Sequence, residues 1–166
     1  MNPLELTDQT DCVIRPAELD EGPALTELAL RAKSHWGYDQ AFLEGARGDL
    51  SIDENTIHEA RIWVLERAGV RLGFYGLIGA APSGRLEWMF LEPDAIGRGY
   101  GRVMWSRAIE QATALGYSEL TIESDRNAEP FYLAMGARRI GATPSPVDGA
   151  PLPLLQLRLA AEPDAD

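Results

Sequence analysis

The chain has 166 residues, which is the size of one domain built around a single hydrophobic core. Its formal net charge of -11, from 15 Lys and Arg against 26 Asp and Glu, argues against a nucleic-acid surface and favours a cationic partner. The single cysteine, Cys12, excludes an internal disulfide, and no Cys or His cluster has the spacing of metal ligands.

Targeting signals are missing from the parts of the sequence where they would be expected. Residues 1–18 lack the basic start and long apolar run of a signal peptide, and no apolar stretch reaches the length of a membrane span. Residues 160–166 are mostly acidic and small, which predicts a solvated, disordered tail. We therefore expect a cytoplasmic protein that binds neither membrane nor nucleic acid.

The first half of the chain alternates between strand-like and helix-like patterns. Two helices are predicted between a first strand and three strand-like runs, while residues 49–60 allow no assignment. The three runs are consecutive and two of them meet at a tight turn near Ala68 and Gly69, which predicts a meander. The expected strands are residues 12–18, 61–69, 70–78 and 85–93, and the expected helices are residues 18–33 and 39–46.

The second half of the chain continues the alternation. An apolar stripe at helical spacing runs from Met104 to Leu115 and ends near Gly116, and residues 127–137 predict a short helix that Gly136 stops. Strands are expected at residues 118–124 and 154–159, with the Pro-rich residues 143–153 as a loop. This order predicts an α/β single domain with a mixed, mostly antiparallel sheet of six to seven strands and helices on both faces.

Glycine occupies every second position of "DAIGRGYGRVMW", at Gly97, Gly99 and Gly101, directly before the predicted helix. A dinucleotide fingerprint needs its third glycine one residue later, where Arg102 stands, and a P-loop needs a Gly-Lys-Ser/Thr sequence. What remains is a turn without Cβ atoms at a helix N-terminus, which favours an anion such as a pyrophosphate. A tight glycine turn without a ligand is the structural alternative.

Two segments together carry a family resemblance, "FLEPDAIGRGYGRVMWSRAIEQATALGY" and "LTIESDRNAEPFYLAMGARRIG". They resemble the acyl-CoA-binding half of the GNAT N-acetyltransferase superfamily, and with the earlier elements the resemblance covers about residues 12–160. The family signature, Gln/Arg-x-x-Gly-x-Gly/Ala, falls on residues 96–101, and Ile96 departs from its polar first position. The resemblance implies acetyl-CoA as acyl donor, with the cradle formed by Ile96, Gly97, Arg98, Gly99, Tyr100, Gly101 and Arg102.

The resemblance also implies roles for residues outside the glycine turn. Tyr132 matches the family tyrosine that is often described as a general acid for the departing thiolate. Asp125 and Asn127 are the candidates for contact with the cofactor arm, although Asn127 could instead be a helix cap. Phe90 and Leu91 match the strand positions that leave a main-chain N–H for the thioester carbonyl.

A catalytic base is needed because an amine acceptor is mostly protonated at neutral pH. Glu87 is the best candidate, since it lies in the apolar run "LEWMFLE", although a side chain at the start of a strand could also point to solvent. Glu92 is expected to be structural. The resemblance implies an acceptor site in the segment between the first two helices. Its aromatic and acidic residues suit an ammonium, although packing alone could also explain them: His35, Trp36, Tyr38 and Asp39.

Three functions follow from these motifs. The leading hypothesis is an N-acetyltransferase that acts on a small amine, an amino acid or a protein N-terminus by direct attack in a ternary complex. The second is a non-catalytic acyl-CoA-binding sensor or partner module, which Ile96 suggests. The third, a nucleotide-binding domain for ATP or NAD, conflicts with the missing Walker lysine and the misplaced glycine. Dimers are common in the family, so a homodimer stays open.

Overall fold

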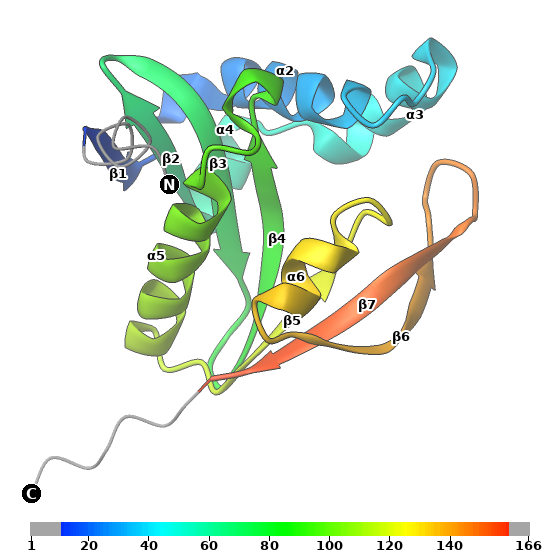
Figure 1. Cartoon of the computed structure of the whole chain (residues 1–166). Helices are drawn as coiled ribbons and strands as arrows, with labels where there is room; N and C mark the ends of the chain where they lie inside the picture. Colours follow the sequence, from blue (N-terminus) through cyan, green and yellow to red (C-terminus); the bar gives the residue numbers. More distant parts are fainter. Residues whose placement is uncertain (1–10, 160–166) are drawn as a thin grey trace, which may run out of the picture. The chain divides into compact units, whose positions relative to one another are not determined.

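The computed structural model describes residues 11–159, so the expected acidic tail and residues 1–10 lie outside the described residues. Seven strands form one mixed sheet in the order β1-β2-β3-β4-β5-β7-β6 (Figure 1). The predicted α/β fold is thereby confirmed. The strands are β1 (Cys12–Pro16), β2 (Arg61–Arg67), β3 (Val70–Ile78), β4 (Ser83–Leu91), β5 (Glu119–Glu123), β6 (Arg138–Pro144) and β7 (Pro151–Arg158).

The helices occupy the predicted places with one addition. Residues 49–60, which the sequence pattern left unassigned, contain α4, where Oδ1 of Asp53 accepts a hydrogen bond from the Thr56 N–H at 2.8 Å. The helices are α2 (Gly22–Ser34), α3 (Gln40–Leu50), α4 (Glu54–Glu59), α5 (Tyr100–Ala114) and α6 (Glu129–Ala134), with short 3-10 turns η1 (Leu19–Glu21) and η2 (Pro93–Ala95). None of the helices between residues 11 and 159 combines the length and apolarity of a membrane span.

The described residues fall into two compact units, each with its own core. The first unit holds residues 11–76 and 88–107, and the second holds residues 77–87 and 108–159. β4 contributes to both units, because its residues 83–87 belong to the second and its residues 88–91 to the first.

In the first unit, α5 packs directly on β3. A Cβ atom added to Gly73 would lie 3.1 Å from Sδ of Met104 and 2.6 Å from the Phe90 carbonyl oxygen, so a side chain at residue 73 has no space. β1 pairs antiparallel with β2, with Ile14 opposite Leu65. Burial of apolar side chains supplies the stabilisation, and the fully buried ones include Leu25, Val64, Leu65, Phe74 and Tyr75.

One side chain joins α2 to the segment before α4. Oγ1 of Thr26 donates a hydrogen bond to the Gly22 carbonyl and accepts one from the Ile52 N–H, both at 2.9 Å. The two backbones approach closely, because a Cβ atom on Gly22 would lie 2.3 Å from the Ile52 carbonyl oxygen. This position therefore requires glycine for reasons of space.

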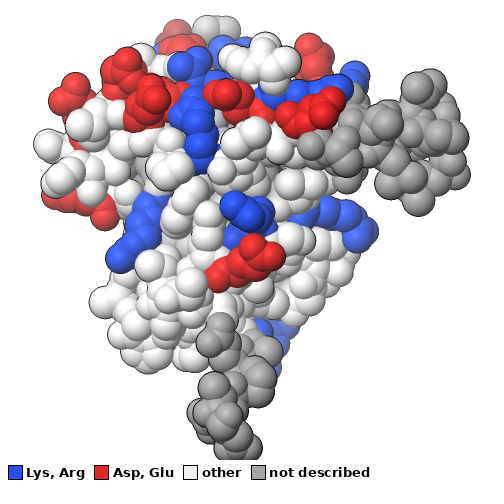
Figure 2. Space-filling model, turned by 90° about the vertical axis from the view of Figure 1, so that its left-hand side faces the viewer, with Lys and Arg blue, Asp and Glu red and all other residues white. Residues whose placement is uncertain are grey.

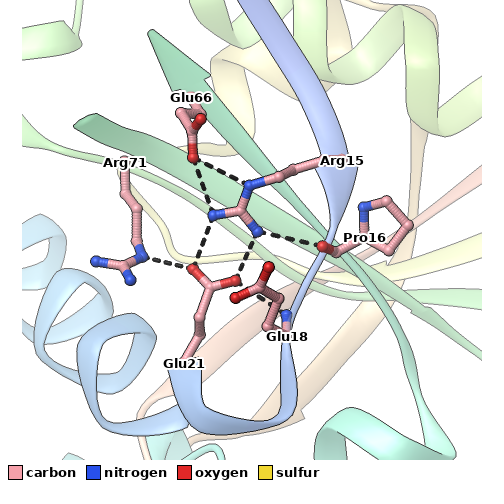
Figure 3. A network of polar contacts seen from close by, with 6 residues as sticks. All are labelled: Arg15, Pro16, Glu18, Glu21, Glu66 and Arg71. Carbon is pink, nitrogen blue, oxygen red and sulfur yellow. Dashed lines mark hydrogen bonds and ion pairs between the residues drawn. The ribbon is translucent and has the colours of Figure 1, made fainter. Parts of the chain in front are cut away.

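A charged network around Glu21 connects η1, β1, β2 and β3 (Figure 3). Glu21 is only 2% exposed, and its carboxylate accepts bidentate hydrogen bonds from Arg15 at 2.6 and 3.0 Å, together with one from Arg71 Nε and one from the Glu18 N–H. Arg15 also donates to Glu66 at 3.0 Å. The hydrogen bonds from Arg15, reinforced by Arg71 and the Glu18 backbone, lower the pKa of Glu21 to about 2 against the opposing effect of burial.

The second unit is a sheet built across parallel and antiparallel pairs. β5 pairs parallel with β4 and antiparallel with β7, and β7 in turn pairs with β6. The hairpin of β6 and β7 is drawn in orange and red in Figure 1. The core of the second unit includes Leu120, Ile122 and Leu155, which are at most 1% exposed.

The prediction of a loop over residues 143–153 was wrong at both ends. Residues 143 and 144 complete β6, and residues 151–153 begin β7, so the loop itself is residues 145–150. Pro153 fits in β7 because its carbonyl accepts from the Ser124 N–H, one residue past the end of β5. The N–H that proline lacks would face the same side of β7 as this carbonyl, beyond the end of β5, so its absence removes no hydrogen bond to a β5 residue. Leu159, expected in the last strand, lies just beyond β7.

β6 forms one end of the strand order and its outer edge pairs with no strand of the described sheet. Its register with β7 shifts between Arg139 and Gly141, which is a bulge, and Arg138 and Arg139 are exposed on it.

Charges of both signs lie together on the surface. On the face drawn in Figure 2, Asp and Glu side chains lie among Lys and Arg side chains. The net negative charge does not produce one continuous acidic surface on this face.

Candidate active site

The glycine turn of the first unit links η2 to α5. Gly97 and Gly99 have φ values of +81° and +88°, which disfavour any side chain, and a Cβ atom at Gly97 would meet no other atom within 4 Å. Buried Ala95 and Tyr100 hold the two ends of the turn. The Gly99 carbonyl accepts a helical hydrogen bond from the Val103 N–H, which places the glycine turn at the N-terminal end of α5, the end at which a helix presents its main-chain N–H groups.

Some side chains near this turn are buried and others are exposed to solvent. Tyr100 is 2% exposed and its hydroxyl lies 3.4 Å from Arg67 Nη1, so only its backbone is placed for a ligand. Arg98 and Arg102 are exposed, whereas Ile96 is half-buried. The turn therefore offers main-chain N–H groups flanked by two exposed guanidinium groups, which is an arrangement suited to phosphate.

Phe90 and Leu91 end β4 just before this turn. The Phe90 ring packs against the Phe74 ring at 5.7 Å between centroids, and Leu91 lies next to Gly73. Glu92, which follows, forms an ion pair with Arg31 of α2. A cavity of about 400 Å³ opens beside that pair and is lined in part by Ala24, Leu28 and Val70. It contains none of the predicted site residues.

The predicted acceptor segment between α2 and α3 has local structural partners. Oδ1 of Asp39 accepts from the Phe42 N–H at 2.8 Å and caps α3, and the Tyr38 ring stacks on Phe42 at 4.2 Å. Trp36 is 42% exposed and contacts His35 edge to face at 5.0 Å. The capping role of Asp39 accounts for its position, while the exposed indole of Trp36 has no such explanation.

Tyr132 lies on α6 in the second unit and is 6% exposed. Burial and, second, the negative charge of Asp125 raise the pKa of Tyr132 far above its ordinary value, so its hydroxyl keeps its proton. Asp125 accepts hydrogen bonds from the N–H and the Nδ2 of Asn127, both at 2.8 Å. Asn127 is not the helix cap that one alternative proposed, because the N-cap of α6 is Ala128, which has no side-chain capping bond.

Glu87 lies in the part of β4 that belongs to the second unit. Its Oε2 lies 2.7 Å from Nε of Arg85 in an ion pair, but the two groups are not aligned as a hydrogen bond, and this buried oxygen has no hydrogen-bond partner among the described residues. The side chain as a whole is 29% exposed. Such an oxygen is unusual, since buried polar atoms nearly always have a partner.

A chain of contacts leads from Glu87 through three residues that sequence reasoning missed, and Arg85 is the first of them. Arg85 also lies 3.6 Å from Glu123 of β5, and Oγ1 of Thr143 in β6 donates to the same Glu123 oxygen at 2.8 Å. The alternation of Arg85 and Glu87 on one strand was the only signal available in the sequence. No cluster of three His, Cys, Asp or Glu within residues 11–159 could hold a metal ion.

Residues 36–151 match the family model of the acetyltransferase (GNAT) domain. The chain therefore belongs to the GNAT superfamily, and it is an acetyl-CoA-dependent acyltransferase.

Solved structures of other acetyltransferases share its fold. A GCN5-related N-acetyltransferase from Rhodopseudomonas palustris is 19% identical with a TM-score of 0.75, covering 90% of this chain and 97% of that one. The PaiA N-acetyltransferase of Thermoplasma acidophilum, solved with coenzyme A, is 16% identical with a TM-score of 0.74 and coverages of 89% and 98%. The ribosomal-protein-S18-alanine N-acetyltransferase of Escherichia coli is 16% identical with a TM-score of 0.69 and coverages of 92% and 97%. No curated protein matches the sequence.

Proposed function

We propose that this protein is a cytoplasmic N-acetyltransferase that transfers the acetyl group of acetyl-CoA to a primary amine by direct attack in a ternary complex. The acceptor class is a small molecule, an amino acid or a protein N-terminus. The observation that carries the proposal is the open glycine turn at the N-terminus of α5, with positive φ at Gly97 and Gly99 and exposed Arg98 and Arg102 beside it. These residues fit the pyrophosphate of coenzyme A.

In the proposed reaction, bound acetyl-CoA supplies the acetyl group, which passes to the amine nitrogen as the carbon–sulfur bond breaks. The hydroxyl of Tyr132 donates a proton to the departing sulfur and regains one from the nitrogen, which loses its second proton as the amide forms, so the raised pKa of Tyr132 keeps the phenol neutral before and after the reaction. Glu87 accepts the proton of the acceptor ammonium, and its unpartnered Oε2 is the atom offered for that proton. A main-chain N–H at Phe90 or Leu91 is assigned to the thioester carbonyl, and Asp125 or Asn127 to the cofactor arm.

The first experiment is a calorimetric titration with acetyl-CoA, run beside ATP and NAD, followed by assay of coenzyme A release on a panel of primary amines. Binding of acetyl-CoA alone in the micromolar range together with release is the expected result. Binding without release on any amine would favour the acyl-CoA sensor that Ile96 suggested. Binding of ATP or NAD alone would overturn the proposal.

Gly99→Val tests the cradle itself. We expect the dissociation constant for acetyl-CoA to rise at least 30-fold, because a branched side chain is strained at a φ of +88° and covers the amides of the turn. Gly69→Val is the matched control, since Gly69 has a φ of +78° in the turn between β2 and β3. It should lose similar stability and bind acetyl-CoA normally. Equal affinities for the two variants would contradict the cradle.

A further inference from the structure

Arg85 lies between two carboxylates on one face of the sheet in the second unit. It is the partner of Thr121 in the parallel pairing of β4 with β5, so it shares a face with Thr121 and with Glu123, two residues further along. Glu87 lies on its other side along β4. All four residues belong to the second unit.

Arg85 lies closer to Glu87 than to Glu123, and neither contact is a hydrogen bond. Its Nε lies 2.7 Å from Oε2 of Glu87 without the alignment of a hydrogen bond, and its Nη2 lies 3.6 Å from Oε2 of Glu123. Thr143 fixes Glu123 by a hydrogen bond of 2.8 Å to that same oxygen. Arg85 itself is 43% exposed. The guanidinium is therefore the member of the group without an aligned hydrogen bond to either carboxylate, whereas Glu123 is held by Thr143.

The guanidinium gives Glu87 a compensating charge but no aligned donor. An ammonium can supply both, because its three N–H groups turn freely toward an acceptor, whereas a guanidinium donates only in its own plane. Satisfying a buried charged oxygen is favourable, since a buried acceptor without a donor is costly. A protonated amine is thus a better partner for Oε2 of Glu87 than Arg85 is.

We propose that Arg85 is a positioning residue that pairs with Glu87 until a protonated primary amine takes its place, whereupon Arg85 moves to Glu123. This exchange rests on the proposed function, because it assigns the acceptor amine to Glu87. The acceptor is then recognised as a cation, which agrees with the net charge of -11. Glu123, held by Thr143, receives the displaced guanidinium and so keeps its charge paired.

Binding tests the exchange without requiring turnover. The protein, saturated with coenzyme A, is titrated calorimetrically with phenethylamine and with 2-phenylethanol as the uncharged match. Wild-type protein should bind the amine at least tenfold more tightly than the alcohol. Arg85→Gln should bind the amine about fivefold more tightly than wild type, because the internal competitor is gone, and should bind the alcohol unchanged. Arg85→Lys keeps an internal cation whose ammonium can donate to Oε2 of Glu87, so it should bind the amine no more tightly than wild type.

The second half of the test concerns Glu123, the carboxylate that receives the displaced guanidinium. Glu123→Gln should weaken amine binding about fivefold, because Arg85 then has no charged partner to move to. In the double variant Arg85→Gln/Glu123→Gln, the amine affinity should equal that of Arg85→Gln alone, since the two residues act through one exchange. Thermal melting of each variant shows that it is folded.

The outcomes separate the exchange from the proposed function. Weaker amine binding in Arg85→Gln, additive effects in the double variant, or an amine that binds wild type no better than the alcohol would each overturn the exchange. Normal turnover with unchanged amine affinity in Arg85→Gln would overturn the exchange and leave the proposed function standing. Loss of the exchange is therefore distinguishable from failure of acetyl transfer, which the coenzyme A release assay reports.

Discussion

Glu21 and Glu87 are both carboxylates paired with arginine, yet their surroundings differ. The carboxylate of Glu21 accepts four hydrogen bonds, from Arg15 twice, Arg71 and Glu18, whereas Oε2 of Glu87 accepts none among the described residues. A carboxylate whose lone pairs are used cannot take another partner, and its depressed pKa fixes its charge. An ion pair by itself therefore does not tell a structural acid from a reactive one, but its hydrogen-bond complement does.

The largest expected effect is the loss of stability when the Glu21 carboxylate is removed. Glu21→Gln leaves Arg15 and Arg71 beside a neutral amide, and removing one partner of a buried pair costs about 3 to 5 kcal/mol. Urea unfolding should show that loss, and the rate per folded molecule should stay unchanged. Glu27→Gln, which removes an exposed pair with Arg47, should cost less than about 0.5 kcal/mol. A loss below about 1 kcal/mol for Glu21→Gln would contradict the comparison.

The pH dependence of stability follows from the same carboxylate. The pKa of Glu21 falls from 4.5 to about 2 on folding, so its contribution is complete above about pH 5 and is lost as the pH falls toward 2. The contribution is about 3 kcal/mol in full, and about 2 kcal/mol of it should be lost at pH 3. Urea unfolding of wild type and Glu21→Gln at pH 6 and pH 3 measures it. A difference between the two proteins that does not shrink on acidification would refute this assignment.

Tyr132 extends the comparison to an uncharged group, because its side chain is buried like that of Glu21. Tyr132→Phe should lower kcat about 1000-fold, the middle of the range for a proton donor, with the acetyl-CoA dissociation constant within about threefold. Tyr117→Phe is the control, because it removes a hydroxyl that donates to the Gly79 carbonyl at 2.6 Å. It should cost about 1 kcal/mol of stability and leave kcat unchanged. Unchanged kcat in Tyr132→Phe would remove that residue from the mechanism.

Glu87→Gln is the counterpart of Glu21→Gln and should have the opposite pattern. We expect kcat to fall about 100-fold, since the base is lost, while the free energy of unfolding changes by less than about 1 kcal/mol. Glu119→Gln, on the neighbouring strand with a hydrogen bond from Ser83, should leave kcat unchanged. If Glu87→Gln lost several kcal/mol of stability and no activity, Glu87 would be a structural acid, as Glu21 is.

Much of the fold could be predicted because periodicity and glycine positions are local signals. The tight turn at Ala68 and Gly69 is an example, since both residues have positive φ, which a two-residue hairpin turn requires. β6 and the start of β7 escaped prediction because Pro144, Pro151 and Pro153 are typical of loops. Their tolerance depends on which strand lies beside them, and the sequence does not contain that information directly.

The candidate site was predictable to the same extent. The glycine turn and Tyr132 lie in continuous motifs, so they could be located from sequence. Arg85, Glu123 and Thr143 meet only because β5 pairs with β4 and with β7, and β7 pairs in turn with β6, each in a fixed register that a one-residue slip would destroy. Asp39 stays a prediction for the acceptor site, and its capping of α3 is a role that the sequence motif did not reveal.

The unpaired outer edge of β6 has a consequence for how the protein behaves at high concentration. An exposed strand edge invites a strand from another molecule, and this is a common route to aggregation. Here the bulge after Arg139 interrupts the regular row of donors and acceptors, the two exposed arginines repel a like edge, and Pro144 supplies no donor at its end. This edge therefore resists growth of the sheet from one molecule into the next.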